Sequence, residues 1–398
     1  MSNKEIVITS AFRTAIGSFG GGLSSKTAPE LGAEVIKKCL EHSEVKGNEV
    51  DTVFMGQVLQ AGAKQNPARQ AAIAAGIPYE TISCTVNQLC ASGLTSVGYG
   101  YNSILLGEAK IAVCGGQESM SNTPHIVNLR NGIKMGPGTI EDSMIKDGLS
   151  CAMNDYHMGV TAENVAEKYQ ITKADQDAFA AASQRKAIEA IKAKKFKDDI
   201  VPVKVKVKKD AITFDTDEYP KDGVTVEKLA GLKPAFKKDG TVTAGNASGI
   251  NDVAAAVLLM TAEEAKNREI EPIAKIVSWA VCGVDPAIMG TGPIPASKKA
   301  LEKAGWGEDQ LDWVEANEAF AAQAIAVNKE LGFTPDRVNV NGGAIALGHP
   351  IGASGARVLV TLLHEMQKRK ANRGLATLCV GGGMGIAMCV ERNFLNHK

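Results

Sequence analysis

The chain opens with short apolar runs that alternate with segments of helical periodicity. Ile6–Ser10 and Val50–Met55 are short and mostly apolar, which predicts two buried strands. Between them, Leu31, Val35 and Leu40 recur at helical spacing. Strands that alternate with helices predict a mostly parallel sheet covered on both faces. The same pattern predicts a helix at 66–76, a strand at 81–87, a helix from Leu94 onward and a strand at 111–114.

The pattern changes between about Ser119 and Ala244, where polar residues are more frequent and the alternation is less regular. Helices are predicted at 162–169 and 174–193. Pro202–Lys209 alternates Val with Lys, which predicts a strand with one wet face. Its lysines could form an anion-binding face, but we favour a solvated edge protected by charge. The whole segment is interpreted as an excursion from the first α/β unit that could cover a substrate.

After Gly249 the second half of the chain repeats the first. Three similarities occur in the same order and at nearly the same spacing, which indicates a duplicated α/β unit with a pseudo-two-fold axis. Two Ala-Ser-Gly segments begin helices, and their small residues predict that these helices pack closely at the centre. The matching segments are Glu5–Ser10 with Ile273–Ser278, Glu49–Val53 with Gln310–Val314, and Ala91–Gly93 with Ala353–Gly355.

Composition limits the partners of the chain. Lysine plus arginine and aspartate plus glutamate both number 44, so no global field favours nucleic acid or a membrane surface. No apolar run reaches the roughly 18 residues that span a bilayer. The first residues also lack the apolar core and cleavage site of a secretion signal. We therefore expect a cytoplasmic protein that binds neither nucleic acid nor membrane.

Several chemistries are disfavoured by missing motifs. The chain has 8 cysteines but no C-x-x-C pair, which argues against a zinc ribbon or a thioredoxin-type motif and favours reduced thiols. It also lacks the phosphate-binding G-x-x-x-x-G-K, a G-x-G-x-x-G after a strand and the metal-binding H-E-x-x-H. No metal site is predicted.

The segment 339–357 carries one histidine in a glycine-rich run, NVNGGAIALGHPIGASGAR. Its glycines let the backbone turn tightly and approach another backbone or a ligand. After Gly352, small and apolar residues recur at helical spacing. The segment is therefore interpreted as a loop that delivers His349 and then starts a helix. The alternative is a structural glycine turn with a satisfied histidine.

Cys90 stands just before a helix predicted to start at about Ser92. A thiol at a helix N-terminus meets free N–H groups and the positive end of the helix dipole. This position predicts a lowered pKa and a nucleophilic thiolate. The alternative is a small buried hydrophobic residue, the usual fate of a free cysteine.

Cys379 ends a predicted buried strand and precedes a glycine run. Ligand sites lie at such strand ends, and free backbone N–H groups there can form an oxyanion hole. Cys114 is predicted to be the structural twin of Cys379, without chemistry. Asn317 follows another predicted strand and could position a water or cap a helix. Two cysteines, a histidine and an asparagine among glycines fit acyl transfer through a cysteine, with imidazole as base and a second thiol for another proton.

These motifs resemble those of the thiolase family, most closely its short-chain biosynthetic members. The resemblance covers nearly the whole chain. Ala91 departs from the glycine that usually follows the nucleophile in this family. The matching motifs are VNQLCASG around Cys90, NEAFAAQ at 317–323, GGAIALGHPIGASGAR at 342–357, CVGGGMG at 379–385, QNPARQ at 65–70, YHMG at 156–159 and GTVTAGNASGINDVAA at 240–255.

The resemblance implies the catalytic roles. Cys90 would carry the acetyl group as a thioester, and His349 would activate Cys90. Asn317, through a water, would share an oxyanion hole with His349. Cys379 would be the acid and base that handles the methyl proton of a second acetyl-CoA. The backbone N–H groups of Cys90 and Gly381 would form a second oxyanion hole.

The resemblance also implies the substrates, which are acetyl-CoA and CoA, with no cofactor required. Two acetyl-CoA would condense to acetoacetyl-CoA, and the reverse reaction would cleave it. Met153 indicates the short-chain class. The alternatives are a broader 3-ketoacyl-CoA thiolase of fatty-acid degradation and a non-catalytic acyl-CoA-binding relative, which should lack Cys90, His349 or Cys379. The implied CoA contacts are Leu149, His157, Ala244, Ser248, Met289, Ala319 and Phe320.

The implied fold is α/β, a duplicated unit whose two similar halves form a layered α-β-α-β-α arrangement with an inserted loop domain. The first half is expected at residues 1–118, completed by 245–270. A loop domain at 119–244 would cover the CoA site, and the second half would span 271–398. The family is usually a homotetramer of tight dimers, and 124–144 matches its tetramer-forming loop.

Overall fold

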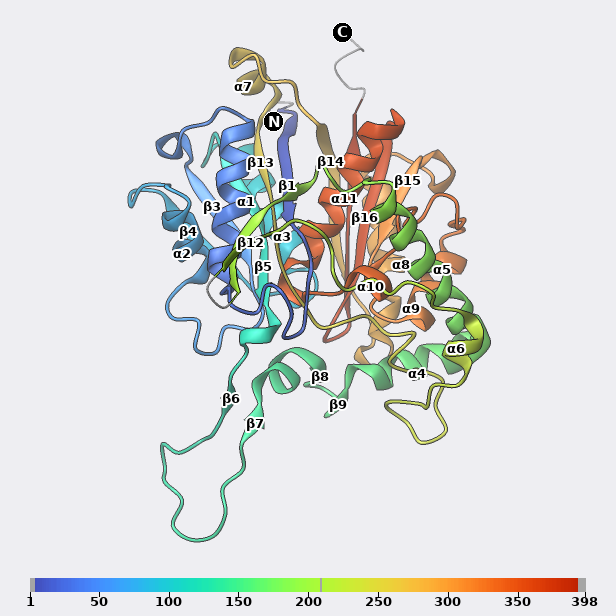
Figure 1. The fold of residues 1–398 in the computed structure, drawn as a ribbon. Helices are drawn as coiled ribbons and strands as arrows, with labels where there is room; N and C mark the ends of the chain where they lie inside the picture. Colours follow the sequence, from blue (N-terminus) through green and yellow to red (C-terminus); the bar gives the residue numbers. More distant parts are fainter. Residues whose placement is uncertain (1–3, 208–209, 393–398) are drawn as a thin grey trace.

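The computed structural model in Figure 1 describes residues 4–207 and 210–392. Its main strands pair in the order β15-β16-β17-β14-β1-β13-β5-β3-β4. The predicted strands are present, and several are longer than expected. The bounds are β1 (Ile6–Thr14), β3 (Thr52–Gly56), β4 (Ile82–Val86), β5 (Ala112–Ser119), β13 (Asn251–Thr261), β14 (Ala274–Gly283), β15 (Trp313–Ala316), β16 (Arg373–Val380) and β17 (Met384–Glu391).

Apart from β4 at one end, the order of strands is symmetrical about the contact between β1 and β14. The two strands pair at only two positions, Val7–Lys275 and Ile8–Ala274. Outward from there, β13 and β5 follow on one side and β17 and β16 on the other, all antiparallel. Next come β3 and β15, each parallel to its inner neighbour. The order of strands therefore bears out the duplication predicted from the sequence.

Two aspartates show the repeat at atomic detail. Asp51 Oδ2, just before β3, accepts hydrogen bonds from the N–H groups of Lys110 and Ile111. Asp312 Oδ2, just before β15, accepts the two corresponding bonds at the start of β16, one of them from Arg373. The similarity between the two short sequences thus preserves one strand-start contact in each half.

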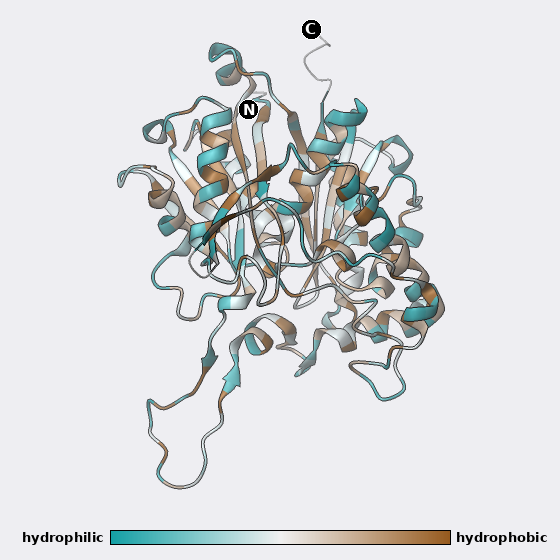
Figure 2. Ribbon diagram, in the orientation of Figure 1, coloured by the Kyte–Doolittle hydropathy of each residue, from teal (hydrophilic) through white to brown (hydrophobic). Residues whose placement is uncertain are grey.

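Alternate strand residues pack into different layers. On β1, Val7 packs with the core of α1 and α2, whereas Ile6 and Ile8 pack with α3 and α11. On β17, Met388 faces α3 and α11, and Ala387 faces α8. The two halves of the sheet therefore lie on either side of α3 and α11, with α1 and α2 outside one half and α8 outside the other. This is the predicted α-β-α-β-α layering. Figure 2 shows apolar strands inside and polar helix faces outside. The helices are α1 (Ala28–His42), α2 (Pro67–Ala74), α3 (Ser92–Leu106), α8 (Pro293–Ala304) and α11 (Ser354–Arg369).

The central helices α3 and α11 meet at their glycines, as predicted from the two Ala-Ser-Gly segments. A Cβ on Gly93 would lie 2.7 Å from the backbone nitrogen of Ala356. A Cβ on Gly355 would lie 2.5 Å from the backbone nitrogen of Leu94. Because both obstacles are backbone atoms, only glycine permits this separation of the two helices.

The predicted pairing of Cys114 with Cys379 is wrong by three residues. In the β3–β5 register Cys114 stands opposite Phe54, and in the β15–β16 register Ala376 takes the same place. Gln117 therefore corresponds to Cys379. The two segments contain similar letters, VCGG at 113–116 and CVGG at 379–382, but the alignment of those letters does not match the register of the hydrogen bonds.

The excursion between β5 and β13 runs over one side of the molecule, where α4 (Met158–Tyr169), α5 (Lys173–Lys192) and α6 (Val226–Ala230) lie near the second half (Figure 1). Its β11 (Val203–Val207) pairs with β12 (Asp210–Phe214). Val203 and Val205 are buried, while Lys204 and Lys206 are exposed, which fits a solvated edge. The last two residues of the predicted strand, 208–209, lie outside the described residues.

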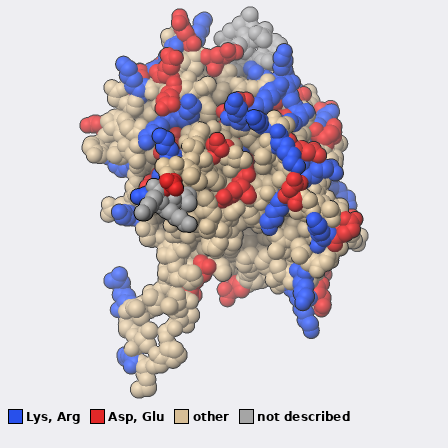
Figure 3. Space-filling model, viewed as in Figure 1, with Lys and Arg blue, Asp and Glu red and all other residues tan. Residues whose placement is uncertain are grey.

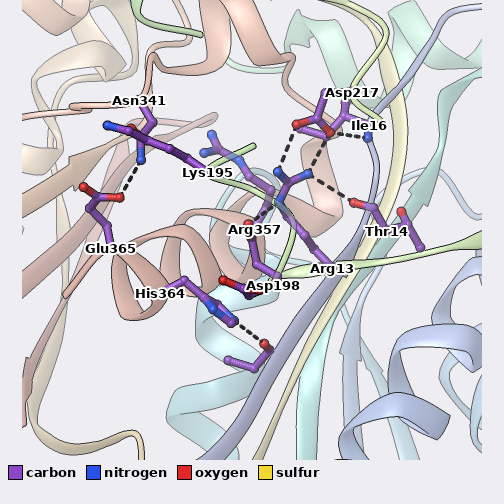
Figure 4. Close-up of polar contacts among 12 residues, drawn as sticks. Arg13, Thr14, Ile16, Lys195, Asp198, Asp217, Asn341, Arg357, His364 and Glu365 are labelled. Atoms are coloured by element: carbon purple, nitrogen blue, oxygen red, sulfur yellow. Dashed lines mark hydrogen bonds and ion pairs between the residues drawn. The ribbon is translucent and has the colours of Figure 1, made fainter. Parts of the chain in front are cut away.

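A buried arginine ties the excursion to the first strand (Figure 4). Arg13 of β1 donates to Asp199 Oδ2 at 3.0 Å and to the two oxygens of Asp217 at 2.7 and 2.9 Å. Arg357 of α11 lies in the same polar cluster, with its nearest carboxylate, Glu315, at 3.8 Å. Arg357 is almost completely buried, eight residues after His349 of the glycine-rich segment.

Candidate active site

A cavity of about 610 Å³ is lined by residues of both halves and of the excursion. Cys90 and His349 lie in its wall, together with Gly381. All of the predicted CoA contacts also line it, namely Leu149, His157, Ala244, Ser248, Met289, Ala319 and Phe320. The structure thus brings most of the predicted site to one cavity.

Cys90 and His349 are in direct contact. The Sγ atom of Cys90 lies 3.2 Å from Nε2 of His349. Cys90 sits on the turn that leads into α3, and His349 follows Gly348 on the glycine-rich loop. Gly348 has φ +110°, and a Cβ there would strike the side chain of Asn251. Asn251 Oδ1 in turn accepts the N–H of His349 at 3.1 Å, so the loop that carries the imidazole is fixed at its backbone.

The far side of the imidazole is also held. Nδ1 of His349 lies 2.6 Å from Oγ of Ser354, the first residue of α11. The Oγ hydroxyl of Ser354 also lies 2.9 Å from the carbonyl oxygen of Pro350, to which it donates. Both imidazole nitrogens therefore have a partner, one in the cavity and one in the core.

Burial sets the charge of the pair. It raises the pKa of Cys90 to about 11, although the N–H groups of Gly381 and of Cys90 itself act in the opposite direction. Burial, and then the positive charge of Arg357, lower the pKa of His349 to about 3. The predicted low pKa of Cys90 is therefore wrong, because desolvation outweighs the helix end. At neutral pH the pair is a thiol facing a neutral imidazole.

Cys379 is the penultimate residue of β16, and the glycines after Val380 turn the chain back into β17. Gly382 and Gly383 have φ of +75° and +85°, which favours glycine at both positions. Cys379 is fully buried, and burial together with the nearby Cys90 raises its pKa well above the usual range. The N–H of Gly381 faces the sulfur of Cys90.

Asn317 follows β15 and is buried, with Nδ2 at 3.5 Å from Nδ1 of His349. Its Oδ1 has no hydrogen-bond partner within residues 4–207 and 210–392. The next helix, α9 (Ala321–Glu330), begins after Phe320, so the alternative interpretation of Asn317 as a helix cap is wrong. Cys90, His349, Asn317 and Cys379 thus converge from four separate segments.

Comparison with known proteins identifies the family. The model of the thiolase N-terminal domain matches residues 6–263, and that of the thiolase C-terminal domain matches residues 270–392. The chain belongs to the thiolase family. Within this family, its similarity to individual members extends over almost the whole chain.

Two similar proteins are the acetyl-CoA acetyltransferases of Rhizobium meliloti and Shinella zoogloeoides. They are 62% and 60% identical to this chain, and each alignment covers 98% of this chain and 100% of the relative. The solved structure of the Bacillus anthracis acetyl-CoA acetyltransferase is 44% identical, with a TM-score of 0.96 and 98% of both chains covered. This similarity fixes the fold of the chain as that of a thiolase.

The departure from the usual thiolase motif at Ala91 does not strain the backbone. Ala91 has φ −77° and ψ −18°, which any residue adopts. Its methyl group is fully buried in the core that surrounds α3 and α11. The extra methyl therefore packs behind the turn and leaves Cys90 open to the cavity.

The sequence analysis missed two residues that line the cavity, Met158 and Phe236, and assigned a role to one that does not, Met153. Met153, which indicated the short-chain class, is 67% exposed and does not line the cavity. Met158 lines it instead and packs with Cys379, Met289 and Phe320. Its place in the YHMG motif was the available signal. Phe236, which no motif marked, stacks on His157 with ring centroids 4.5 Å apart.

Within the two described ranges, no group of three or more His, Cys, Asp or Glu side chains is placed to hold a metal ion. Over the same residues, the longest apolar helices fall short of what a membrane crossing requires.

Proposed function

We propose that the chain is an acetyl-CoA acetyltransferase that converts two acetyl-CoA into acetoacetyl-CoA and CoA, reversibly and without an added cofactor. The observation that carries the proposal is the contact of 3.2 Å between Cys90 Sγ and His349 Nε2 in the wall of the cavity. The names of the similar proteins from Rhizobium meliloti and Shinella zoogloeoides support the same substrate.

In the first half-reaction Cys90 takes the acetyl group. Nε2 of His349 removes the thiol proton while the sulfur attacks the thioester carbonyl, since a neutral imidazole is the acceptor that a buried thiol needs. The bond from the carbonyl carbon to the CoA sulfur breaks, and Cys379 gives that sulfur its proton. The oxyanion formed on the way accepts from the N–H groups of Cys90 and Gly381. Acetyl-Cys90, imidazolium and a Cys379 thiolate remain.

In the second half-reaction the Cys379 thiolate takes a proton from the methyl group of another acetyl-CoA. The enolate oxygen accepts from the imidazolium Nε2–H of His349 and from a water held by Asn317. The enolate carbon then attacks acetyl-Cys90 and forms the new carbon–carbon bond. The Cys90 sulfur leaves and recovers its proton from His349, so both thiols and the neutral imidazole are restored. A thiolate at Cys379 is strongly basic in this dry site, as the small acidity of the methyl group requires.

The acyl end of the cavity fits a short chain. Met158, Met289 and Phe320 pack with Cys379 in one apolar cluster, so the sulfur of Cys379 is enclosed by large side chains. The cavity also has the His157–Phe236 stack in its wall and is lined by Ser248 and Ala244, which suits a pantetheine arm. These features favour acetoacetyl-CoA over longer β-ketothioesters.

We also infer a homotetramer of tight dimers that works in the cytoplasm. The segment between β6 (His125–Ile126) and β7 (Glu141–Asp142) extends away from the body and carries exposed Leu129, Met135 and Ile140 (Figure 1). The edge strand β4 exposes Ile82, which suits pairing with a second copy. All eight cysteines are free, which suits a reducing compartment.

The test is CoA-dependent cleavage of acetoacetyl-CoA and of a longer β-ketoacyl-CoA by the wild type and by Cys90→Ser. We expect rapid loss of the short substrate only, and no turnover in the variant. Comparable rates on both substrates would assign the chain to the broader 3-ketoacyl-CoA thiolases. No cleavage of either substrate would favour the non-catalytic acyl-CoA-binding relative. Cys84→Ser, which changes an exposed cysteine outside the cavity, is the matched control.

A further inference from the structure

Ser354 holds the imidazole of His349 on the side away from the cavity. Its Oγ lies 2.6 Å from Nδ1, whereas the amide nitrogen of Asn317 is 3.5 Å away. The shorter contact is a full hydrogen bond, and the longer one lies at the limit for any bond. Ser354 is completely buried, so bulk water does not compete for Nδ1.

The neighbours of Ser354 decide which atom carries each proton. The carbonyl oxygen of Pro350 can only accept, and it lies 2.9 Å from Oγ. If the hydroxyl donated to Nδ1 instead, two acceptor oxygens would face each other at that distance without a proton between them. The arrangement with a proton in every contact is therefore Nδ1–H to Oγ, and Oγ–H to the Pro350 oxygen.

This assignment leaves a lone pair on Nε2, directed at Cys90. The thiol of Cys90 then donates to Nε2 across 3.2 Å, and the three contacts form one donor chain from the sulfur to the Pro350 carbonyl. The other tautomer would place N–H against S–H and could not take the thiol proton. Which nitrogen is protonated is set by the bond that the other nitrogen makes.

We propose that Ser354 is a positioning residue that keeps His349 in the tautomer able to deprotonate Cys90. The inference rests on the proposed acetyl transfer, and it assigns a task to a serine that the sequence marked only as part of a helix start. Ser354 acts through His349 and touches no substrate.

The duplicated half provides an internal comparison. Ser92 occupies the same place at the start of α3, and its Oγ donates to the Leu89 carbonyl at 2.6 Å. Its second partner is the backbone N–H of Gln88, at 2.9 Å. Both serines therefore close the turn before their helix, but only Ser354 bonds an imidazole. The structural part of the role is common to the two, and the tautomer control belongs to Ser354.

The experiment is single-turnover acetylation of Cys90 by acetyl-CoA, followed by peptide mass spectrometry. For Ser354→Ala we expect a rate lower by about 10- to 100-fold, the size of the loss when the hydrogen-bond partner that orients a metal-binding histidine is removed. The half-saturating concentration of acetyl-CoA should not change, because Ser354 does not line the cavity. Ser354→Thr, which keeps the hydroxyl, should recover most of the rate.

A double-mutant cycle separates this role from a purely structural one. In a His349→Ala background, Ser354→Ala should cause no further loss, because the two residues act as one unit. An equal loss with and without His349, or a wild-type rate in Ser354→Ala, would overturn the proposal.

Ser92→Ala measures the loss in Tm that comes from the turn alone. If Ser354→Ala does not fold, Ser354→Cys has nearly the same volume and a weaker acceptor, and a wild-type rate there would have the same meaning. A wild type that cannot be acetylated at Cys90 would contradict the proposed function instead.

Discussion

At the level of single residues, the site moves the pKa values of Cys90 and His349 further apart than they are in water. Burial raises that of Cys90 and lowers that of His349, so in the proposed reaction the proton stays on sulfur until a thioester carbonyl arrives. A free thiolate at this position would react with oxidants and other electrophiles. The neutral pair avoids this side reaction, because the nucleophile forms only as the bond to carbon forms.

The first prediction concerns this resting state. Since the pKa of Cys90 is about 11, its alkylation by iodoacetamide should be slow at pH 7 and should still be rising at pH 9.5, as the thiolate fraction grows about tenfold per pH unit below the pKa. The measurement is the alkylated fraction of the Cys90 peptide over time, with an added free cysteine-containing peptide as reference. In His349→Ala, where no imidazole can take the thiol proton, a rate that is already constant between pH 7 and 8 would mean a low-pKa thiolate and would refute the neutral pair.

The second prediction concerns chain length. Met158→Ala removes the end of a side chain that packs beside Cys379, so a β-ketohexanoyl-CoA should gain room. We expect its kcat/KM relative to acetoacetyl-CoA to rise on the order of tenfold, the usual worth of a methylene or two in an apolar pocket. Met153→Ala, at an exposed position outside the cavity, is the matched control. A change in the control but not in Met158→Ala would restore the sequence-based assignment of Met153.

At the level of helices and strands, periodicity located most elements and missed those without it. Residues 174–193 were predicted as a helix, and α5 spans Lys173–Lys192. By contrast β13 is buried on both faces and reads NDVAAAVLLMT, so no alternation of apolar and polar residues marks it. Likewise α4 begins at Met158 rather than at the predicted 162, because His157 caps it with Nδ1. The sequence pattern therefore failed to locate an element where burial on both faces removed the alternation, and it failed to place a helix start that depends on a side-chain cap.

The site shows the same division. Cys90, His349 and Asn317 each stand at an element end that the sequence could place, and the thiolase resemblance named their roles. The pKa of Cys90 was predicted in the wrong direction, since a helix end is visible in sequence but the depth of burial is not. The sequence marked Ser354 only as a small residue at a helix start. Its proposed role depends on the contacts of its hydroxyl with the imidazole of His349 and the carbonyl of Pro350, which the sequence does not reveal.

The third prediction tests the central helix pair. Gly93→Ala would place a Cβ 2.7 Å from the backbone of Ala356, so α3 and α11 must separate. We expect a loss of about 1–3 kcal/mol or more in the free energy of unfolding, the usual cost of overpacking. Gly231→Ala is the matched control, since its nearest neighbour would be a backbone oxygen 3.8 Å away. Equal stability of the two variants in urea would show that the helices can move apart freely.

At the level of the whole molecule, duplication explains why only one active site results from two similar halves. The Ala-Ser-Gly segments align Cys90 with Gly352, so the second half has no thiol at that place. A Cβ on Gly352 would lie 2.6 Å from Oε2 of Glu118, which accepts the N–H of Gly352 at 2.7 Å. The space beside Gly352, the counterpart of Cys90 in the second half, is thus occupied by the buried side chain of Glu118 from the first half. The two halves therefore differ at this place, with a thiol in the first and a glycine held by Glu118 in the second.

The charge distribution points to how copies of the molecule would associate. Figure 3 shows Lys and Arg mixed with Asp and Glu over the body, whereas the extended segment between β6 and β7 is mostly uncharged apart from a few basic side chains. Met135 in this segment is 95% exposed, and Ile140 is 69% exposed. An apolar segment that projects into solvent is costly in a monomer, and burial against other copies would remove that cost.

The fourth prediction follows from this segment. Aspartate at both positions, Met135→Asp with Ile140→Asp, should disfavour its burial between copies by more than 2 kcal/mol, since each buried carboxylate would lose its hydration. We expect light scattering after gel filtration to show a dimer where the wild type is a tetramer, with acetyl transfer retained because neither residue lines the cavity. Ile212→Asp, at an exposed site on β12, controls for added charge alone. An unchanged mass in the double variant would contradict a tetramer built on this segment and would direct attention to the edge strand β4 instead.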